Sequence, residues 1–267
     1  ATLLSDWRAL AEKLVRPDPS PTMCIEAVGV AWGDPLAVDT ETDFLDGDLL
    51  ATSACREPGT SFFYRPAPSE LSSSLLVGHN IKYDTKVLAR HGLDITERKL
   101  ADTMVAAFLV GEDRLGLKPL ALKRLGVEMA TLGPLLGRAQ LDITKEFVAT
   151  ACLDETTSKQ LRASLALVKA AADPQAALAH RFKLRQAIGE PPTASVRTVM
   201  ERYPDEFQRY SCADADMTLR LWRVLEPEMV SKGVSDLFWN VEMPLVPVLI
   251  SMENRGLAID RDRAREV

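Results

Sequence analysis

Two carboxylates stand two positions apart at the end of a short apolar run, in the stretch LAVDTET at residues 36–42. A short apolar run of this kind predicts a β-strand, and side chains at alternate positions leave the same face of a strand, roughly 6 to 7 Å apart. Asp39 and Glu41 are therefore predicted to point the same way. Two acids on one face can hold a cation together.

Two predicted helices carry further acids at helical spacing. On the helix that starts near Asn80, Asp84 lies beside Tyr83 and one turn from Asn80. On a later helix, Tyr210 and Asp214 are four residues apart and so lie on one face. Acids that point inward from apolar elements are costly unless another charge compensates them.

Divalent cations supply that compensation directly. Mg²⁺ and Mn²⁺ prefer carboxylate oxygens, and two such ions about 3.5 to 4 Å apart stabilise the attacking and leaving oxygens of phosphodiester cleavage. Asp39 and Glu41 could hold one ion together and bridge to a second. The sequence therefore predicts a site for two divalent metal ions, Mg²⁺ or Mn²⁺.

β-Strands are expected in the N-terminal part of the chain. Residues 24–32 and 36–42 are predicted to be extended, and the segments 49–55 and 60–66 flank the turn signal EPG. Together they suggest a meander of about three antiparallel strands. Another short apolar run ends at Gly78.

The rest of the chain has mostly helical patterns. These cover residues 80–92, 101–111, 115–126 and 209–229, and two or three further helices are expected within 144–205. Helices that follow strands and pack on them indicate an α/β or α+β domain built on one mixed sheet.

The overall composition is that of an ordinary globular protein. The chain has 267 residues, of which 46% are hydrophobic and 26% are charged. No run of about 18 apolar residues occurs, and the N-terminal segment reads as an amphipathic helix capped by Ser5 rather than as a signal sequence. We expect a cytoplasmic protein that does not enter a membrane.

Charge and cysteines exclude other classes of site. The net charge of −6 argues against a general polyanion-binding surface, although it allows nucleic acid to be held locally through bound cations. The four cysteines are far apart without CxxC spacing, so neither a zinc site nor a disulfide framework is expected.

The motifs VDTET, VGHNIKYD, ADTM and YSCADADMTLRL occur in this order. They resemble the exonuclease motifs of the 3′–5′ proofreading domain of family A DNA polymerases, the bacterial DNA polymerase I type. The tail VEMPLVPVLISMENRGLAID resembles the segment that leads into the polymerase domain. The resemblance implies an RNase H-like mixed sheet flanked by helices. It also implies an exonuclease domain at 1–234, with a helical insertion at about 144–205, and the stub of a polymerase domain at 235–267.

The resemblance also implies a role for each matching acid. Asp39, Glu41 and Asp214 would bind the first metal ion, and Asp39 with Asp84 would place the second near the leaving 3′ oxygen. Tyr210 would orient the attacking water, because a phenol with an ordinary pKa near 10 is a poor base at neutral pH.

A related subclass of these nucleases carries a histidine five residues before the last acid. That position is Arg209 here, so the resemblance is to the tyrosine subclass of the DEDD exonucleases. The implied substrate contacts are Thr40, His79, Asn80 and Tyr83.

The implied reaction is the metal-dependent removal of the 3′-terminal nucleotide from single-stranded or frayed DNA, which serves proofreading. The catalytic motifs of a polymerase are absent from this chain, so DNA synthesis would depend on a downstream polymerase domain. We expect a monomer, as a fragment of a longer polypeptide. The alternatives are a stand-alone exoribonuclease of the RNase D type and a degenerate domain that only binds single strands.

Several other conspicuous residues have ordinary structural explanations. Asp102 is expected to be the N-cap of a helix rather than a ligand. Asp216 lies about 200° round the helix from Asp214 and is expected to be solvated or capping, outside the site. The aromatic residues Trp222, Phe238 and Trp239 are expected to pack in the core rather than to stack on bases.

Overall fold

The computed structural model describes residues 23–26, 35–44, 47–69, 71, 73–150, 159, 192–258, 263 and 265. The chain divides into two compact units, Ala1–Ala130 with Gln208–Val267 and Thr131–Phe207. The predicted N-terminal helix, the extended segment at 27–32 and most of the predicted helices within 144–205 lie outside the described residues.

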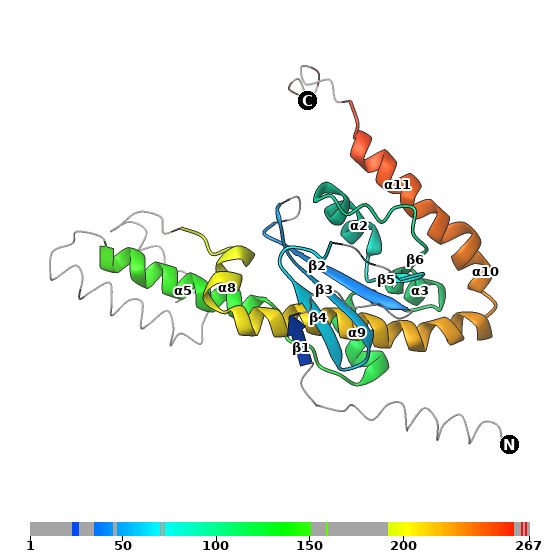
Figure 1. The fold of residues 1–267 in the computed structure, drawn as a ribbon, viewed down its shortest axis with the longest axis horizontal. Coiled ribbons are helices and arrows are strands. Elements are labelled where there is room, and N and C mark those ends of the chain that lie inside the picture. The colour runs from blue at the N-terminus through cyan, green and yellow to red at the C-terminus, as the bar shows by residue number, and fades with distance from the viewer. Residues whose placement is uncertain are drawn as a thin grey trace. The chain divides into compact units, whose positions relative to one another are not determined.

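A mixed sheet is the framework of the first unit (Figure 1). Its six strands in the described part of the chain have the order β1-β4-β3-β2-β5-β6. They are β1 (Met23–Glu26), β2 (Leu36–Thr42), β3 (Leu49–Glu57), β4 (Thr60–Tyr64), β5 (Leu76–Gly78) and β6 (Leu100–Asp102). The antiparallel meander β2-β3-β4 and the mixed sheet are confirmed. The parallel strand β6 was not predicted, because three residues are too few to show a period.

Small residues lie opposite the two acids of β2. Asp39 pairs with Ser53 of β3, and Glu41 pairs with Ala51. The pairing shifts between Glu41 and Thr42, so a bulge ends the regular ladder directly after the second acid. Short neighbours leave space beside the carboxylates on this part of the sheet.

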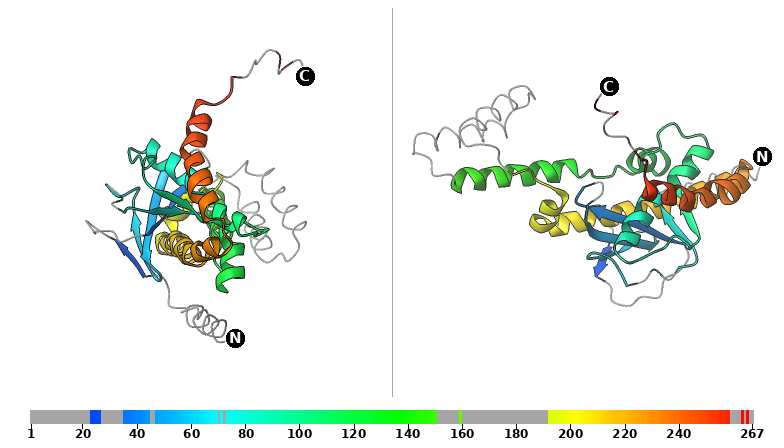
Figure 2. Two further views of the ribbon diagram at one scale, coloured as in Figure 1. Left: turned by 90° about the vertical axis from the view of Figure 1, so that its right-hand side faces the viewer. Right: turned by 90° about the horizontal axis from the view of Figure 1, so that it is seen from above.

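Helices complete the unit. They are α2 (Ile81–Arg90), α3 (Thr103–Leu109), α4 (Leu117–Leu120), the π-helical turn η1 (Ala121–Leu125), α9 (Pro204–Ser231), α10 (Ser235–Leu237), the π-helical turn η2 (Phe238–Glu242) and α11 (Met243–Arg255). Figure 2 shows α9 along one face of the sheet. The helices predicted at 80–92 and 209–229 are confirmed as α2 and α9, although α9 begins earlier, at Pro204.

Serine side chains bring α9 close to the sheet. Ser53 Oγ donates to the carbonyl oxygen of Ser211 at 2.8 Å, and Ser61 Oγ donates to that of Cys212 at 3.0 Å. Larger side chains at these strand positions would push the helix away, because a packed interior has little spare volume. The close approach brings Ser211 and Cys212 of α9 next to β3 and β4.

Asp216 joins α9 to the β3–β4 turn. Its side chain is only 1% exposed, and it accepts from Arg220 Nε at 2.9 Å and Arg220 Nη2 at 3.0 Å. It also accepts from the backbone N of Gly59 at 2.9 Å. The expectation that Asp216 is solvated or capping is therefore wrong, because the hairpin turn folds over this face of the helix.

An aromatic cluster closes the core at the end of α9. The ring centroids of Trp222 and Phe238 are 5.7 Å apart, and those of Phe238 and Trp239 are 4.9 Å apart in an edge-on arrangement. Trp222 and Phe238 are fully buried. The prediction that these aromatic residues pack in the core is confirmed.

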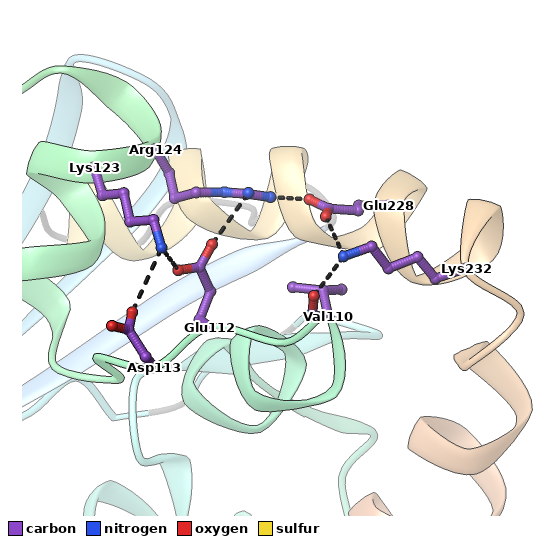
Figure 3. Close-up of polar contacts among 7 residues, drawn as sticks. All are labelled: Val110, Glu112, Asp113, Lys123, Arg124, Glu228 and Lys232. Carbon is purple, nitrogen blue, oxygen red and sulfur yellow. Dashed lines mark hydrogen bonds and ion pairs between the residues drawn. The ribbon is translucent and has the colours of Figure 1, made fainter.

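A chain of ion pairs fastens η1 to α9 (Figure 3). The carboxylate of Glu112, whose side chain is 5% exposed, lies 2.6 Å from Lys123 Nζ and 3.1 Å from Arg124 Nη1. Arg124 also pairs with Glu228 of α9, which in turn lies 3.0 Å from Lys232 Nζ. We refer to Glu112, Arg124, Glu228 and Lys232 as the η1 clamp.

The second unit contains two described helices, α5 (Gly133–Thr150) and α8 (Val196–Arg202). Arg202 and Glu146 form a two-pronged ion pair at 2.6 Å. Ser195 caps α8 in a reciprocal capping box with Thr198. Both helices overlap the region 144–205, where helices are predicted.

Among the described residues, no single helix has both the length and the apolar character that crossing a membrane requires. One pair of helices, Pro204–Ser231 with Ser235–Arg255, meets that criterion only when joined across a bend of 116°. Cys55 and Cys212, the two cysteines of the described part whose side chains are placed, form no disulfide bond.

The substitution Asp216→Ala should destabilise the fold by about 3 kcal/mol, because it leaves a guanidinium without its partner in a largely buried place. Urea denaturation measures the change. Asp113→Ala is the matched control, since the Asp113 side chain is 78% exposed and its removal should cost about 0.5 kcal/mol or less. Equal midpoints for the two variants would contradict the structural role given to Asp216.

Candidate active site

Three carboxylates from two distant parts of the sequence meet beside the sheet. Asp39 and Glu41 come from β2 and Asp214 comes from α9, and one ligand oxygen of each lies within 4.8 Å of the others. Asp214 is buried at 7% exposure, and the two strand acids are half-buried. Strand alternation puts Asp39 and Glu41 on the face that α9 covers.

Asp84 lies next to this group but is not one of the three. It is 4% exposed on α2, and its Oδ1 accepts from the backbone N of Thr40 at 3.1 Å and from Thr40 Oγ1 at 2.7 Å. The charge of Asp84 raises the pKa of both Asp39 and Glu41, so its field reaches them. The structure thus groups three of the four predicted acids and holds the fourth beside them through Thr40.

Asp102 fixes the start of the helix that carries Asp84. Its side chain accepts from Met104 N at 2.8 Å, which confirms it as the N-cap of α3. It also accepts from Asn80 N and Ile81 N, both at 3.0 Å. One buried carboxylate therefore anchors the first turns of two helices.

The predicted substrate contacts surround the start of α2. Asn80 has a φ of 70°, a left-handed conformation that starts the helix abruptly after β5. His79 Nδ1 lies 2.8 Å from Thr103 Oγ1, and the Tyr83 hydroxyl lies 2.6 Å from Thr42 Oγ1. Burial lowers the pKa of His79 to about 4, so this side chain is neutral at physiological pH.

Lys118 is the residue of the site that sequence reasoning missed. Its Nζ lies 3.2 Å from Asp214 Oδ2 and 3.4 Å from the Tyr210 hydroxyl. Nothing in the sequence distinguishes this lysine from other basic residues, since it lies on a different element, 96 positions from Asp214.

Burial and mutual repulsion dominate the electrostatics of the acids. Burial raises the pKa of Asp39 well above its ordinary value, and the charges of Glu41 and Asp214 raise it further. Burial raises the pKa of Glu41 to about 8. Burial also raises the pKa of Asp84 to about 7 and that of Asp214, whose shift is opposed by Lys118. Burial and mutual repulsion therefore oppose the ionisation of all four acids together, and a bound cation would relieve this repulsion.

Tyr210 lies one turn before Asp214 on α9, as its spacing predicts. Burial raises the pKa of its phenol well above the ordinary value, and the charges of Asp214 and Glu41 act in the same direction. The hydroxyl therefore stays protonated at neutral pH and can donate a hydrogen bond. Its chemistry suits orientation of a water molecule rather than base catalysis.

The donor set fits a divalent cation. All the candidate ligands are carboxylate oxygens, which Mg²⁺ and Mn²⁺ prefer. Oxygens that each lie about 2.1 Å from one ion are at most about 4.2 Å apart, so the three oxygens, which lie within 4.8 Å of one another, need only a small inward shift to share an ion. Burial and the neighbouring acids raise the pKa values of Asp39 and Glu41. A bound divalent cation would stabilise the ionised forms of both side chains.

The mixed sheet with helices packed on it has the RNase H-like fold. Brucella melitensis NrnC, solved with bound Mg²⁺, superposes with a TM-score of 0.51 at 15% identity, covering 84% of this chain and 92% of that chain. The same protein solved bound to pGG also gives 0.51, with 83% and 85% covered. At this identity the likeness establishes the fold.

The family comparison is more specific. Residues 70–133 match the family model of the 3′–5′ exonuclease domain of DNA polymerase A. DNA polymerase I of Rhizobium leguminosarum is 27% identical over 194 residues, which are 72% of this chain and 14% of that protein. DNA polymerase I of Chloroflexus aurantiacus is 26% identical over 236 residues, 87% of this chain and 18% of that protein. The chain thus spans less than a fifth of the length of either relative. These matches confirm the resemblance to the 3′–5′ exonuclease domain of family A DNA polymerases.

The pH dependence of stability should reveal the acidic cluster in metal-free protein. Glu41 has a pKa of about 8 in the folded chain against an ordinary value of 4.5, so the folded state binds its proton more tightly. Its contribution to stability is fully present below about pH 4.5 and is lost as the pH rises to about 8. The unfolding free energy should therefore fall with pH in this interval, by at most about 1.4 kcal/mol per unit for one proton.

Urea denaturation in EDTA at about pH 5.5 and about pH 7.5 measures this change. Glu41→Gln, which cannot ionise, should show a smaller loss between the two pH values, and Mg²⁺ should reduce the loss in the wild type. Identical pH profiles for the wild type and Glu41→Gln would contradict the repulsion inferred at this site.

Proposed function

We propose that this chain is a metal-dependent 3′–5′ exonuclease that hydrolyses the 3′-terminal phosphodiester of single-stranded or frayed DNA and releases nucleoside 5′-monophosphates. The proposal depends on the convergence of Asp39, Glu41 and Asp214 within 4.8 Å, with Asp84 next to them. A pair of divalent ions in such a site stabilises both the attacking and the leaving oxygen of an in-line displacement.

The residues of the chain have distinct parts in this proposal. Asp39, Glu41 and Asp214 would hold the first ion, and Asp39 with Asp84 the second. Thr40 keeps Asp84 in place through two hydrogen bonds to its Oδ1. The half-buried Tyr210, one turn from Asp214, would donate to the attacking water and fix its direction of approach.

The strand end would approach from the start of α2. His79, Asn80 and Tyr83 lie together there, and Tyr83 contacts Thr42 at the end of β2. A neutral histidine, an amide and a phenol offer hydrogen bonds and apolar surface without adding charge. They suit the recognition of an unstacked nucleotide rather than of duplex DNA.

We further propose that the activity serves proofreading within a family A DNA polymerase. The relatives are named DNA polymerase I, and the chain covers less than a fifth of them. On this proposal residues 1–234 form the exonuclease domain, residues 235–267 begin the polymerase domain, and the downstream polymerase domain is the partner. The protein would act as a monomer in the cytoplasm on DNA during replication and repair.

An activity on RNA is the second candidate, because the structural neighbour NrnC has been solved with the nucleic acid pGG. Matched oligodeoxynucleotides and oligoribonucleotides with a 5′ label separate the two candidates. We expect Mg²⁺-dependent shortening from the 3′ end, faster on DNA. Faster shortening of RNA would contradict the assignment to proofreading.

Asp39→Ala should reduce Mg²⁺-dependent shortening of the DNA oligomer by about 100-fold or more, because it removes a ligand shared by both proposed ions. Gel analysis of the labelled oligomer measures the rate. Asp113→Ala, a change of the same type at an exposed position, should retain wild-type activity. Undiminished shortening by Asp39→Ala would contradict the assignment of the activity to this site.

Tyr210→Phe should lower kcat by about tenfold to a hundredfold and leave KM nearly unchanged, since it removes one oriented hydrogen bond and little else. Single-turnover kinetics on the DNA oligomer separate the two quantities. Tyr64→Phe on β4 is the matched control and should behave as the wild type. A rise in KM with unchanged kcat would assign Tyr210 to substrate binding instead.

A further inference from the structure

Lys118 places an ammonium group among the acids of the candidate active site. Its Nζ lies 3.2 Å from Asp214 Oδ2, 3.4 Å from Asp214 Oδ1 and 3.4 Å from the Tyr210 hydroxyl. The same atom lies 4.8 Å from the centre of the Tyr210 ring, within the range of a cation–π contact. One cation thus touches both functional residues of α9.

The elements around Lys118 fix its position. Lys118 lies on α4, and the two residues that lead from α4 into η1, Leu120 and Ala121, are fully buried. The η1 clamp then joins Arg124 to Glu228 of α9 (Figure 3). Because η1 follows α4 directly, the clamp also fixes the backbone of Lys118 relative to the helix that carries Asp214.

The ion pair between Lys118 and Asp214 is weaker than the pair between Arg220 and Asp216 on the same helix. Asp216 has a two-pronged contact with Arg220 at 2.9 and 3.0 Å and is 1% exposed, which makes a permanent pair. Asp214 faces a single ammonium at 3.2 Å, and the Lys118 side chain is 27% exposed. An ammonium on a flexible stem that reaches solvent can leave its partner at little cost.

We propose that Lys118 is a positioning residue that holds Asp214 and Tyr210 together in the metal-free chain and competes with a divalent cation for Asp214. The inference rests on the proposed function, because it requires Asp214 to be a metal ligand. Lys118 opposes the repulsion among the acids when no metal ion is bound. It must withdraw from Asp214 before that carboxylate can bind an ion.

Binding of Mn²⁺ to the full chain, followed by electron paramagnetic resonance of the free ion, tests this competition without any measurement of activity. Lys118→Met should bind Mn²⁺ about fivefold more tightly than the wild type, an effect of the size expected for one partly exposed ion pair. Lys118→Arg keeps the charge and should stay close to the wild type.

Lys123→Met is the matched control. It removes the same charge from the same segment, but Lys123 contacts Glu112 and Asp113 instead of the site, and its side chain is 56% exposed. Its Mn²⁺ affinity should equal that of the wild type. A second readout is thermal stability, where Mn²⁺ should raise the Tm of Lys118→Met by more than that of the wild type.

The outcomes separate the two proposals. Asp39→Ala should lose Mn²⁺ binding, and a wild-type chain that binds no Mn²⁺ would overturn both the proposed function and the role of Lys118. If the wild type binds and Asp39→Ala does not, equal or weaker binding by Lys118→Met overturns the competition alone. If Lys118→Met does not fold, Lys118→Gln takes its place with the same expectation.

Discussion

Repulsion between buried and half-buried carboxylates is the constraint on which this structure depends. Asp39, Glu41 and Asp214 come within 4.8 Å of one another, and burial makes their charges harder to screen. Such a group can exist only where the surrounding fold is stable enough to force it together. The short side chains of Ser53 and Ser61, which hydrogen-bond to the backbone of α9, meet this need, because they keep the helix close to the sheet.

The acids of this protein fall into two groups according to what satisfies them. Asp102 accepts from three backbone N–H groups, and Asp216 accepts from Arg220 and Gly59, so both are occupied with holding elements together. Asp39 and Glu41 instead face other acids, and the cation next to Asp214 is a partly exposed lysine. Carboxylates that already have strong partners stabilise the fold, whereas those held against repulsion remain able to bind a cation.

The sequence predicts the features of this site that depend on local spacing. Strand alternation puts Asp39 and Glu41 on one face, helical spacing puts Tyr210 beside Asp214, and both local patterns persist in the structure. Lys118 could not be predicted, because its contact with Asp214 joins elements 96 residues apart and depends on the η1 clamp. The burial of Asp216 was missed for the same reason, since only the folded hairpin covers it.

The pKa of Tyr210 depends on the groups that the fold brings around its hydroxyl. A cation 3.4 Å from a phenol would by itself favour ionisation, yet burial and the charges of Asp214 and Glu41 outweigh it and raise the pKa of Tyr210. The phenol therefore remains a donor whether or not Lys118 stays in contact. On the proposed function, the carboxylates would accept hydrogen bonds from the attacking water and the phenol would donate one to it. The tertiary arrangement of β2 against α9 reinforces this role, because burial and the nearby acids raise the pKa of a phenol that is already protonated at neutral pH.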